Sequence, residues 1–375
     1  LELPVAERQD LAGLPFATRK LNKSEASKVA ALILQDIYQR EKEALQAEWS
    51  SKEMKLGDKS MKFDYRIFGE KPVDGRSLYI SMHGGGNTSA AANDQQWKNQ
   101  IGLYSPEEGV YLAPRAPTNT WNLWHEAHID SFFDKLILSA VLFEGVNPDK
   151  VYLMGYSAGG DGVFQLAPRM SDRFAAAAMM AGHPNETSPL GLRNIGFALH
   201  MGELDKAYNR NEVAKRWAVM LDSLQREDPG GYTHYVKIHE GRPHWMNRED
   251  TIAVPWMARF RRDALPKKIV WVQDDVHHLN YYWLGVPQSC VKTGGLVVVS
   301  RQGNEFIVES NYADTLRIYL NDEMVNLNKK ISVKMNGKVV YVGKPERTLL
   351  SVYQSLIQRK DPKLVFSSVM EIVNN

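Results

Sequence analysis

The chain has 375 residues, of which 43% are hydrophobic and 24% charged, and its formal net charge is only +2. This size and composition leave room for one large globular domain and a smaller one. The small net charge, without any run of basic residues interleaved with aromatic ones, gives no case for nucleic-acid binding. No apolar stretch reaches the roughly 18 residues that would span a bilayer. The single cysteine, Cys290, excludes an internal disulfide and a cysteine-rich zinc site, and we expect it in the core.

Residues 1–55 are expected to form an N-terminal helical extension. Asn22 and Glu25 have the spacing of a capping box, and apolar residues then recur at helical spacing to about residue 49. The default expectation is that this helix packs against the domain that follows, and a dimer or lid helix is the alternative. The chain begins at Leu1 rather than methionine, which is compatible with removal of a secretory signal. The expected localisation therefore leans to an exported protein, periplasmic or secreted.

Two predicted strands open the next domain. Residues 61–68 alternate apolar and polar side chains, as a strand near a sheet edge does, and residues 76–82 form a buried apolar run. The second run ends in the His-Gly-Gly-Gly of residues 83–86, the signature of an oxyanion-hole loop. Glycines in such a loop let backbone N–H groups approach a developing oxyanion.

Residues 113–124 are predicted to form a loop, because they contain two prolines and an Asn-Thr pair. Trp121 and Trp124 lie in this loop and are candidate walls of a substrate pocket, with simple covering of the core as the alternative. The His-Glu-Ala-His at residues 125–128 lacks the H-E-x-x-H spacing, so no metal site is expected.

The most informative motif is Gly-Tyr-Ser-Ala-Gly-Gly at residues 155–160, which contains G-x-S-x-G. An apolar run precedes it and a helix-compatible segment follows, which is the strand–turn–helix context of a nucleophile elbow. Gly155 and Gly159 supply the small residues that must flank a serine in a strained turn. Ser157 is therefore the candidate nucleophile, because a serine hydroxyl must be presented to a base at hydrogen-bond distance to react.

Two more buried strand patterns, residues 195–201 and 232–238, are each followed by a loop with ionisable side chains. Asp205 follows the first strand and His244 the second, so nucleophile, acid and histidine occur in the α/β-hydrolase order. In α/β sheets such positions face the ligand. We assign His244 as general base and then general acid, and Asp205 as the group that orients the imidazole.

Each assignment has a rival nearby in the sequence. Glu203 is the alternative acid. His239 lies at a strand end and is expected to be packed. His183 precedes the acid in the chain, so it is expected to line the site rather than to act as the base. Trp245, next to the candidate base, is a further candidate for substrate binding.

After Pro266 the pattern changes to mostly strands, and residues 267–375 are predicted to form a β-rich, sandwich-like domain. Tyr281, Tyr282 and Trp283 are expected to fill its core, with a sugar-binding platform as the alternative. The expected elements are strands at 268–272, 296–299, 306–308 and 316–320, a hairpin over 331–341 centred on Asn336-Gly337, a helix at 349–358 and a strand at 363–366.

Residues 60–262 resemble the α/β-hydrolase superfamily. The doubled glycine of Gly-Tyr-Ser-Ala-Gly-Gly, the HGGG loop and the Ala-Pro-Arg at 113–115 resemble its polyhydroxybutyrate-depolymerase and feruloyl-esterase-like branch. The resemblance implies a doubly wound α/β sheet over residues 56–266. It also places the oxyanion donors at the backbone N–H of Ala158 and at Gly84 or Gly85, without deciding between those two.

The leading hypothesis is a serine carboxylesterase that works through an acyl-enzyme and needs no cofactor or metal. Its partner would be a small-molecule or polymeric ester, and neither the natural ester nor the oligomeric state follows from the sequence. A prolyl-oligopeptidase-type peptidase is the alternative within enzymes, but the first ~60 residues leave no room for its propeller. A non-catalytic glycan- or polymer-binding protein on a hydrolase scaffold is the alternative from another class.

Overall fold

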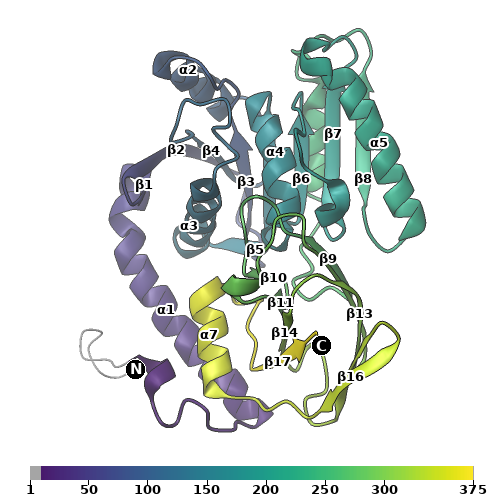
Figure 1. Cartoon of the computed structure of the whole chain (residues 1–375). Coiled ribbons are helices and arrows are strands. Elements are labelled where there is room, and N and C mark those ends of the chain that lie inside the picture. Colours follow the sequence, from purple (N-terminus) through teal and green to yellow (C-terminus); the bar gives the residue numbers. More distant parts are fainter. Residues whose placement is uncertain (1–9, 375) are drawn as a thin grey trace. The chain divides into compact units, whose positions relative to one another are not determined.

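The computed structural model describes residues 10–374, which form two compact units. The larger, which we call the α/β unit, comprises Leu45–Asp263. The smaller, the β-rich unit, combines the described residues up to Ala44 with the chain from Ala264 onward (Figure 1).

The α/β unit is built on one eight-stranded sheet in the order β1-β2-β4-β3-β5-β6-β7-β8. All neighbours from β4 to β8 pair in parallel, whereas β2 pairs antiparallel with both β1 and β4. This is the doubly wound α/β-hydrolase sheet that the sequence predicted, so the fold class is confirmed. The strands are β1 (Glu53–Leu56), β2 (Lys59–Phe68), β3 (Arg76–Met82), β4 (Gly109–Pro114), β5 (Val146–Tyr156), β6 (Ala176–Met180), β7 (Gly196–Gly202) and β8 (His234–His239).

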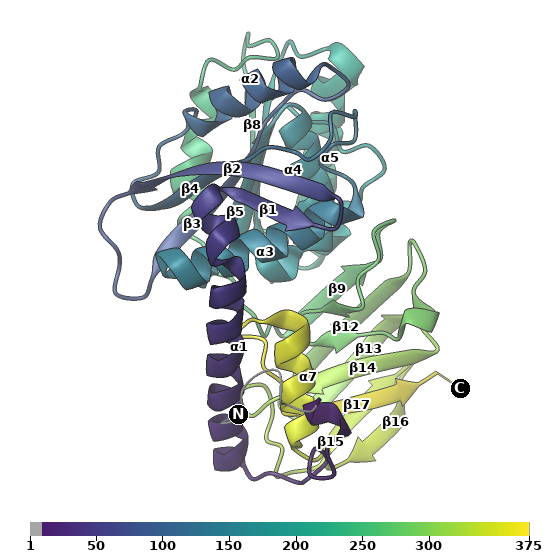
Figure 2. The same cartoon turned by 90° about the vertical axis from the view of Figure 1, so that its left-hand side faces the viewer.

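Both faces of this sheet are buried, which explains why its central strands are almost continuously apolar. Successive side chains alternate between faces: Leu153 packs in the core beneath α3, α4 and α5, whereas Tyr152 and Met154 pack in the core beside α6. Figure 2 shows α2 and α3 on opposite sides of the sheet. The helices are α2 (Ala90–Ile101), α3 (Ala127–Glu144), α4 (Ala158–Arg169), α5 (Arg210–Glu227) and α6 (Ala253–Met257).

The β-rich unit has a four-stranded sheet, in the order β10-β11-β14-β17, and a five-stranded sheet, in the order β16-β15-β13-β12-β9. Side chains of both sheets share one apolar core, which makes the unit sandwich-like as predicted. The strands are β9 (Lys268–Val272), β10 (Asn280–Tyr281), β11 (Leu284–Gly285), β12 (Leu296–Gln302), β13 (Glu305–Asn311), β14 (Thr315–Leu320), β15 (Ile331–Met335), β16 (Lys338–Gly343) and β17 (Ser368–Val373), and the helix is α7 (Leu349–Arg359).

Most local predictions for this unit hold. Asn336 and Gly337 have positive φ values of 51° and 75° and join β15 to β16, as a two-residue hairpin turn requires. Tyr281, Tyr282 and Trp283 are all buried in the core, which excludes the alternative of an exposed sugar platform. Cys290 is half-buried against the same core.

One predicted strand is wrong. Residues 363–366 form no strand, and the last strand is β17, Ser368–Val373. The backbone N–H of Lys363 donates to the Asp361 side chain and that of Leu364 to the Asp361 carbonyl, so this segment turns. Its apolar side chains fill the core from a turn, and side-chain apolarity alone does not distinguish that from a strand.

Helix α1 (Lys23–Ser51) begins with the predicted capping box, in which Asn22 and Glu25 exchange backbone-to-side-chain hydrogen bonds of 2.8 and 3.0 Å. Its buried face differs from the default expectation. Ile33 and Ile37 pack against Val352 and Leu356 of α7, so this part of the helix belongs to the β-rich unit. Within residues 10–374, no helix is long and apolar enough to cross a membrane.

Candidate active site

Ser157 lies in the sharp turn between β5 and α4. Its φ of 58° and ψ of −120° are rare for a non-glycine residue, so the turn is strained. A Cβ on Gly155 would collide with the backbone of Gly159, and a Cβ on Gly159 would collide with the carbonyl of Met82. These contacts explain why the turn needs the two glycines of G-x-S-x-G.

The loops after β7 and β8 bring the other two predicted residues to Ser157. His244 Nε2 lies 2.9 Å from Ser157 Oγ, and His244 Nδ1 lies 2.6 Å from Asp205 Oδ2. The Asp205 side chain is 1% exposed and that of His244 is 43% exposed. Because a carboxylate only accepts hydrogen bonds, Nδ1 carries the proton and Nε2 accepts from the serine hydroxyl. The rival acid, Glu203, is exposed, and its carboxylate accepts from the backbone N–H of Gly241 at 2.8 Å.

Tyr156 holds the loop that carries His244. Its hydroxyl donates to the carbonyl oxygen of His244 at 2.7 Å and accepts from the backbone N–H of Met246 at 2.9 Å. Burial raises the pKa of Tyr156, so the hydroxyl stays protonated and remains a donor. The sequence pattern did not indicate this role, although Tyr156 occupies the first variable position of G-x-S-x-G.

The HGGG loop lies directly against the serine, since a Cβ on Gly84 would be 3.1 Å from that of Ser157. His83 is buried and fixes the loop. Its Nε2 accepts from the backbone N–H of Ala116 at 3.1 Å, so its Nδ1 is the donor in the 2.6 Å hydrogen bond to the Gly84 carbonyl. Burial lowers the pKa of His83 to about 4, which keeps the imidazole neutral.

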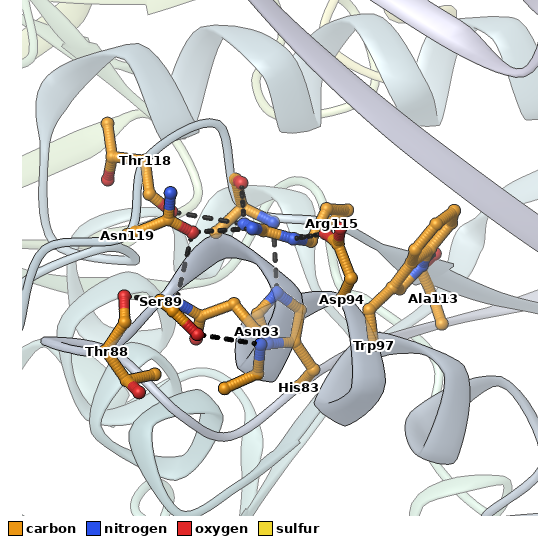
Figure 3. Close-up of polar contacts among 12 residues, drawn as sticks. His83, Thr88, Ser89, Asn93, Asp94, Trp97, Ala113, Arg115, Thr118 and Asn119 are labelled. Carbon is orange, nitrogen blue, oxygen red and sulfur yellow. Dashed lines mark hydrogen bonds and ion pairs between the residues drawn. The ribbon is translucent and has the colours of Figure 1, made fainter.

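A network of polar side chains supports the same loop (Figure 3). The buried Asn93 accepts from the backbone N–H of Gly86 at 2.9 Å and donates to Asn119 at 3.0 Å. Arg115 donates to Asn119 at 2.5 Å and to Asp94 at 2.8 Å. Because the backbone N–H of Gly86 already donates to Asn93, Gly84 and Gly85 remain the candidate oxyanion donors in the HGGG loop. Ala158 is the candidate on the other, since the first N–H groups of a helix lack intrahelical partners.

Ser157 lines two cavities. The first, which we call the His244-side pocket, has a volume of about 390 Å³ and a predominantly apolar lining. The second, which we call the Arg210 pocket, has a volume of about 530 Å³ and contains charged side chains. Lining residues of the first include Gln96, Leu103, Tyr156, His244 and Trp245, and those of the second include Trp121, Asp161, His183, Asn185, Tyr208 and Arg210.

The three predicted tryptophans differ in position. Trp121 is 60% exposed and lines the Arg210 pocket, and Trp245 is 47% exposed and lines the His244-side pocket. The expectation that Trp124 lines the site is wrong. Trp124 is fully buried, and its indole N–H donates to the carbonyl of His83 at 3.0 Å, so it supports the HGGG loop from within the core.

His183 and His239 lie as expected, the first in the lining of the site and the second packed. His183 lines the Arg210 pocket, and burial lowers its pKa. His239 is packed, with Nε2 3.1 Å from His200 Nδ1 and Nδ1 3.2 Å from Glu249. Among the residues that the structure describes, no group of three or more His, Cys, Asp or Glu side chains is arranged to hold a metal ion.

Comparison with known proteins finds partial similarity to solved structures of esterases. No protein-family model and no curated protein matches the chain. A thermostable esterase matches 56% of the chain and 62% of its own length, at 18% identity and a TM-score of 0.42. The chain thus spans less than two thirds of that protein. Esterase 2 of Thermogutta terrifontis matches 55% of this chain and 89% of its own, at 17% identity and a TM-score of 0.39.

The feruloyl esterase module of Clostridium thermocellum covers 54% of this chain and 83% of its own, at 14% identity and a TM-score of 0.37. Similarity at this level does not extend to a reaction or a substrate. Only the geometry of the site itself therefore indicates which reaction it supports.

Proposed function

We propose that the chain is a serine carboxylesterase that hydrolyses carboxylic esters through an acyl-enzyme. The observation that supports this most is the continuous hydrogen-bonded series from Ser157 Oγ through His244 to the buried Asp205. A hydroxyl, an imidazole and a carboxylate in this order have the geometry of nucleophilic acyl transfer.

In the first half-reaction, Ser157 Oγ attacks the ester carbonyl carbon while His244 Nε2 takes the hydroxyl proton. The carbonyl oxygen becomes an oxyanion between the N–H of Ala158 and that of Gly84 or Gly85, each donor typically worth about 3 kcal/mol. The carbon–oxygen bond to the alcohol then breaks, and His244 gives its proton to the departing alcohol. Asp205 holds the imidazole in the correct tautomer and stabilises its protonated form.

In the second half-reaction, a water molecule replaces the alcohol. His244 takes a proton from this water, which attacks the acyl carbon, and the proton returns to Ser157 Oγ as the acid departs. No redox change occurs: the ester and one water molecule supply every atom of the acid and the alcohol, and Ser157 and His244 return to their starting states.

The test is hydrolysis of p-nitrophenyl butyrate, together with labelling by a fluorophosphonate that is located by mass spectrometry. We expect turnover, and a label on Ser157. Ser157→Ala, His244→Ala and the double variant should lose similar, non-additive amounts of activity. Absence of both turnover and label would favour a binding protein on this scaffold. A label with cleavage of peptide amides but not of esters would favour the peptidase.

A further inference from the structure

We propose that the Arg210 pocket binds the acyl part of the substrate, and that Arg210 selects acyl groups that carry a carboxylate. This inference rests on the proposed esterase function and names its substrate class: half esters of dicarboxylic acids and other esters whose acyl chain ends in a carboxylate.

The position of His244 indicates which pocket holds the alcohol part of the ester and which holds the acyl part. In the proposed reaction His244 Nε2 protonates the departing alcohol, so the alcohol must lie beside the imidazole. His244 lines the first pocket, whereas the Arg210 pocket is lined by Ser157 and Ala158 and lacks His244. The acyl group, which stays bonded to Ser157 Oγ, therefore extends into the Arg210 pocket.

Arg210 is a cation whose donors are little used by the protein. Its side chain is only 11% exposed, and its closest carboxylate, Asp205 Oδ1, lies 3.9 Å from Nη1, which is too far for a hydrogen bond. Its buried Nε has no hydrogen-bond partner among the described residues. A guanidinium presents several N–H donors in a planar fork that suits a carboxylate, so a ligand of this type would use these groups.

The backbone before Arg210 is held in an unusual conformation. Tyr208 and Asn209 both have positive φ values, 55° and 59°; asparagine tolerates this conformation, but it is unfavourable for a tyrosine. The guanidinium carbon then lies 4.8 Å from the centre of the Tyr208 ring. Arg210 is also the first residue of α5, where a cation is unfavourable for the helix dipole and an anion is favourable. The Tyr208 ring therefore holds the guanidinium in place, and the N-terminus of α5 favours an anion beside it.

Asp161 is the group in the pocket that opposes this selection. Its Oδ1 accepts from the backbone N–H of His183 at 2.6 Å, and burial raises its pKa to about 6. When ionised it repels a carboxylate bound to Arg210. Opposite effects are therefore expected for the two residues: loss of Arg210 should weaken the preference for charged acyl groups, and Asp161→Asn should strengthen it.

The experiment compares matched substrates that differ only in charge. Monomethyl adipate is paired with the methyl ester of its ω-amide, and the same pair is made for glutarate and pimelate to vary the reach. Acid release is followed at constant pH. We expect wild-type kcat/KM for the best carboxylate ester to exceed that of its amide partner by about tenfold to a hundredfold, the range for hydrogen bonds to charged groups.

Arg210→Gln should bring this ratio close to unity, and Arg210→Lys should keep part of it. Arg226→Gln removes the same charge from an exposed position in the last turn of the same helix and should leave the ratio unchanged. Because each pair shares the chemical step, any effect of Arg210 on Asp205 changes both rates and cancels in the ratio. If Arg210→Gln does not fold, the kcat/KM ratios of the wild type and of Arg210→Lys still test whether Arg210 selects the carboxylate.

A wild-type ratio at or below unity, or half esters that are not hydrolysed by an enzyme active on p-nitrophenyl butyrate, would overturn the inference and leave the esterase function standing. A charge preference seen only for para-carboxyphenyl over para-carbamoylphenyl butyrate would place the anion on the alcohol and would also overturn it. Absence of turnover and of fluorophosphonate labelling is the separate failure of the proposed function.

Discussion

Replacement of Tyr156 by phenylalanine tests whether the site depends on the loop that carries His244. The substitution keeps the ring, which lies 5.5 Å from that of Trp245, and removes only the hydroxyl. Two backbone groups lose their partner: the carbonyl of His244 and the N–H of Met246, which is a buried residue. One buried, unsatisfied N–H costs about 1–3 kcal/mol, which we expect as the loss in the free energy of unfolding.

The larger effect should be on turnover. A loop that is free to shift changes the 2.9 Å distance between His244 Nε2 and Ser157 Oγ, and misplacement by about 1 Å can cost a hundredfold. We expect kcat for p-nitrophenyl butyrate to fall by about tenfold to a hundredfold with a much smaller change in KM, since the pocket wall is retained.

Tyr152→Phe is the matched control. Tyr152 lies on the same strand, and its hydroxyl donates to the carbonyl of Phe260 at 2.9 Å, away from the His244 loop. Its loss should lower stability, measured by urea unfolding, and leave kcat unchanged. If Tyr156→Phe retains the kcat of Tyr152→Phe at a similar loss of stability, the proposed role of Tyr156 as a positioning residue is refuted.

Three further outcomes are expected. Asp205→Asn should lower kcat by about 10⁴-fold, because the imidazole loses its correct tautomer, and Glu203→Gln should have little effect. The reverse pattern in steady-state kinetics would make Glu203 the acid. Because burial raises the pKa of Asp161 from 3.8 to about 6, the folded state binds its proton more tightly than the unfolded state, and stability falls as pH rises between these values. Asp161→Asn should therefore be more stable than wild type above the higher pKa, by on the order of 1–3 kcal/mol in denaturant titrations, and show no such gain below the lower one. Truncation after residue 266 should expose Ile33 and Ile37, which pack against α7, and give aggregated protein in size-exclusion chromatography. A soluble, fully active fragment would show that residues 267–375 are not needed to cover this face of α1.

The sequence determined the features that depend on local geometry. The elbow needs small residues where backbones meet, so Gly155 and Gly159 identify it by their spacing around Ser157. The Asn336-Gly337 turn and the Asn22–Glu25 capping box are likewise specified by residues next to one another in the chain. Parallel strands end at one edge of a sheet, and therefore the order serine, acid, histidine was enough to predict that Ser157, Asp205 and His244 meet.

For other residues, only the tertiary structure decided which distant side chains they contact. Trp121 and Trp124 have the same local sequence environment, yet one is exposed at a pocket and the other buried against the HGGG loop. The hydroxyl of Tyr156 has its role because a loop 88 residues later lies against it. Arg210 lines a pocket together with Asp161 and His183, which come from other parts of the chain. In each case the side chain's partners come from other elements, and nothing in the sequence around these residues identifies those partners.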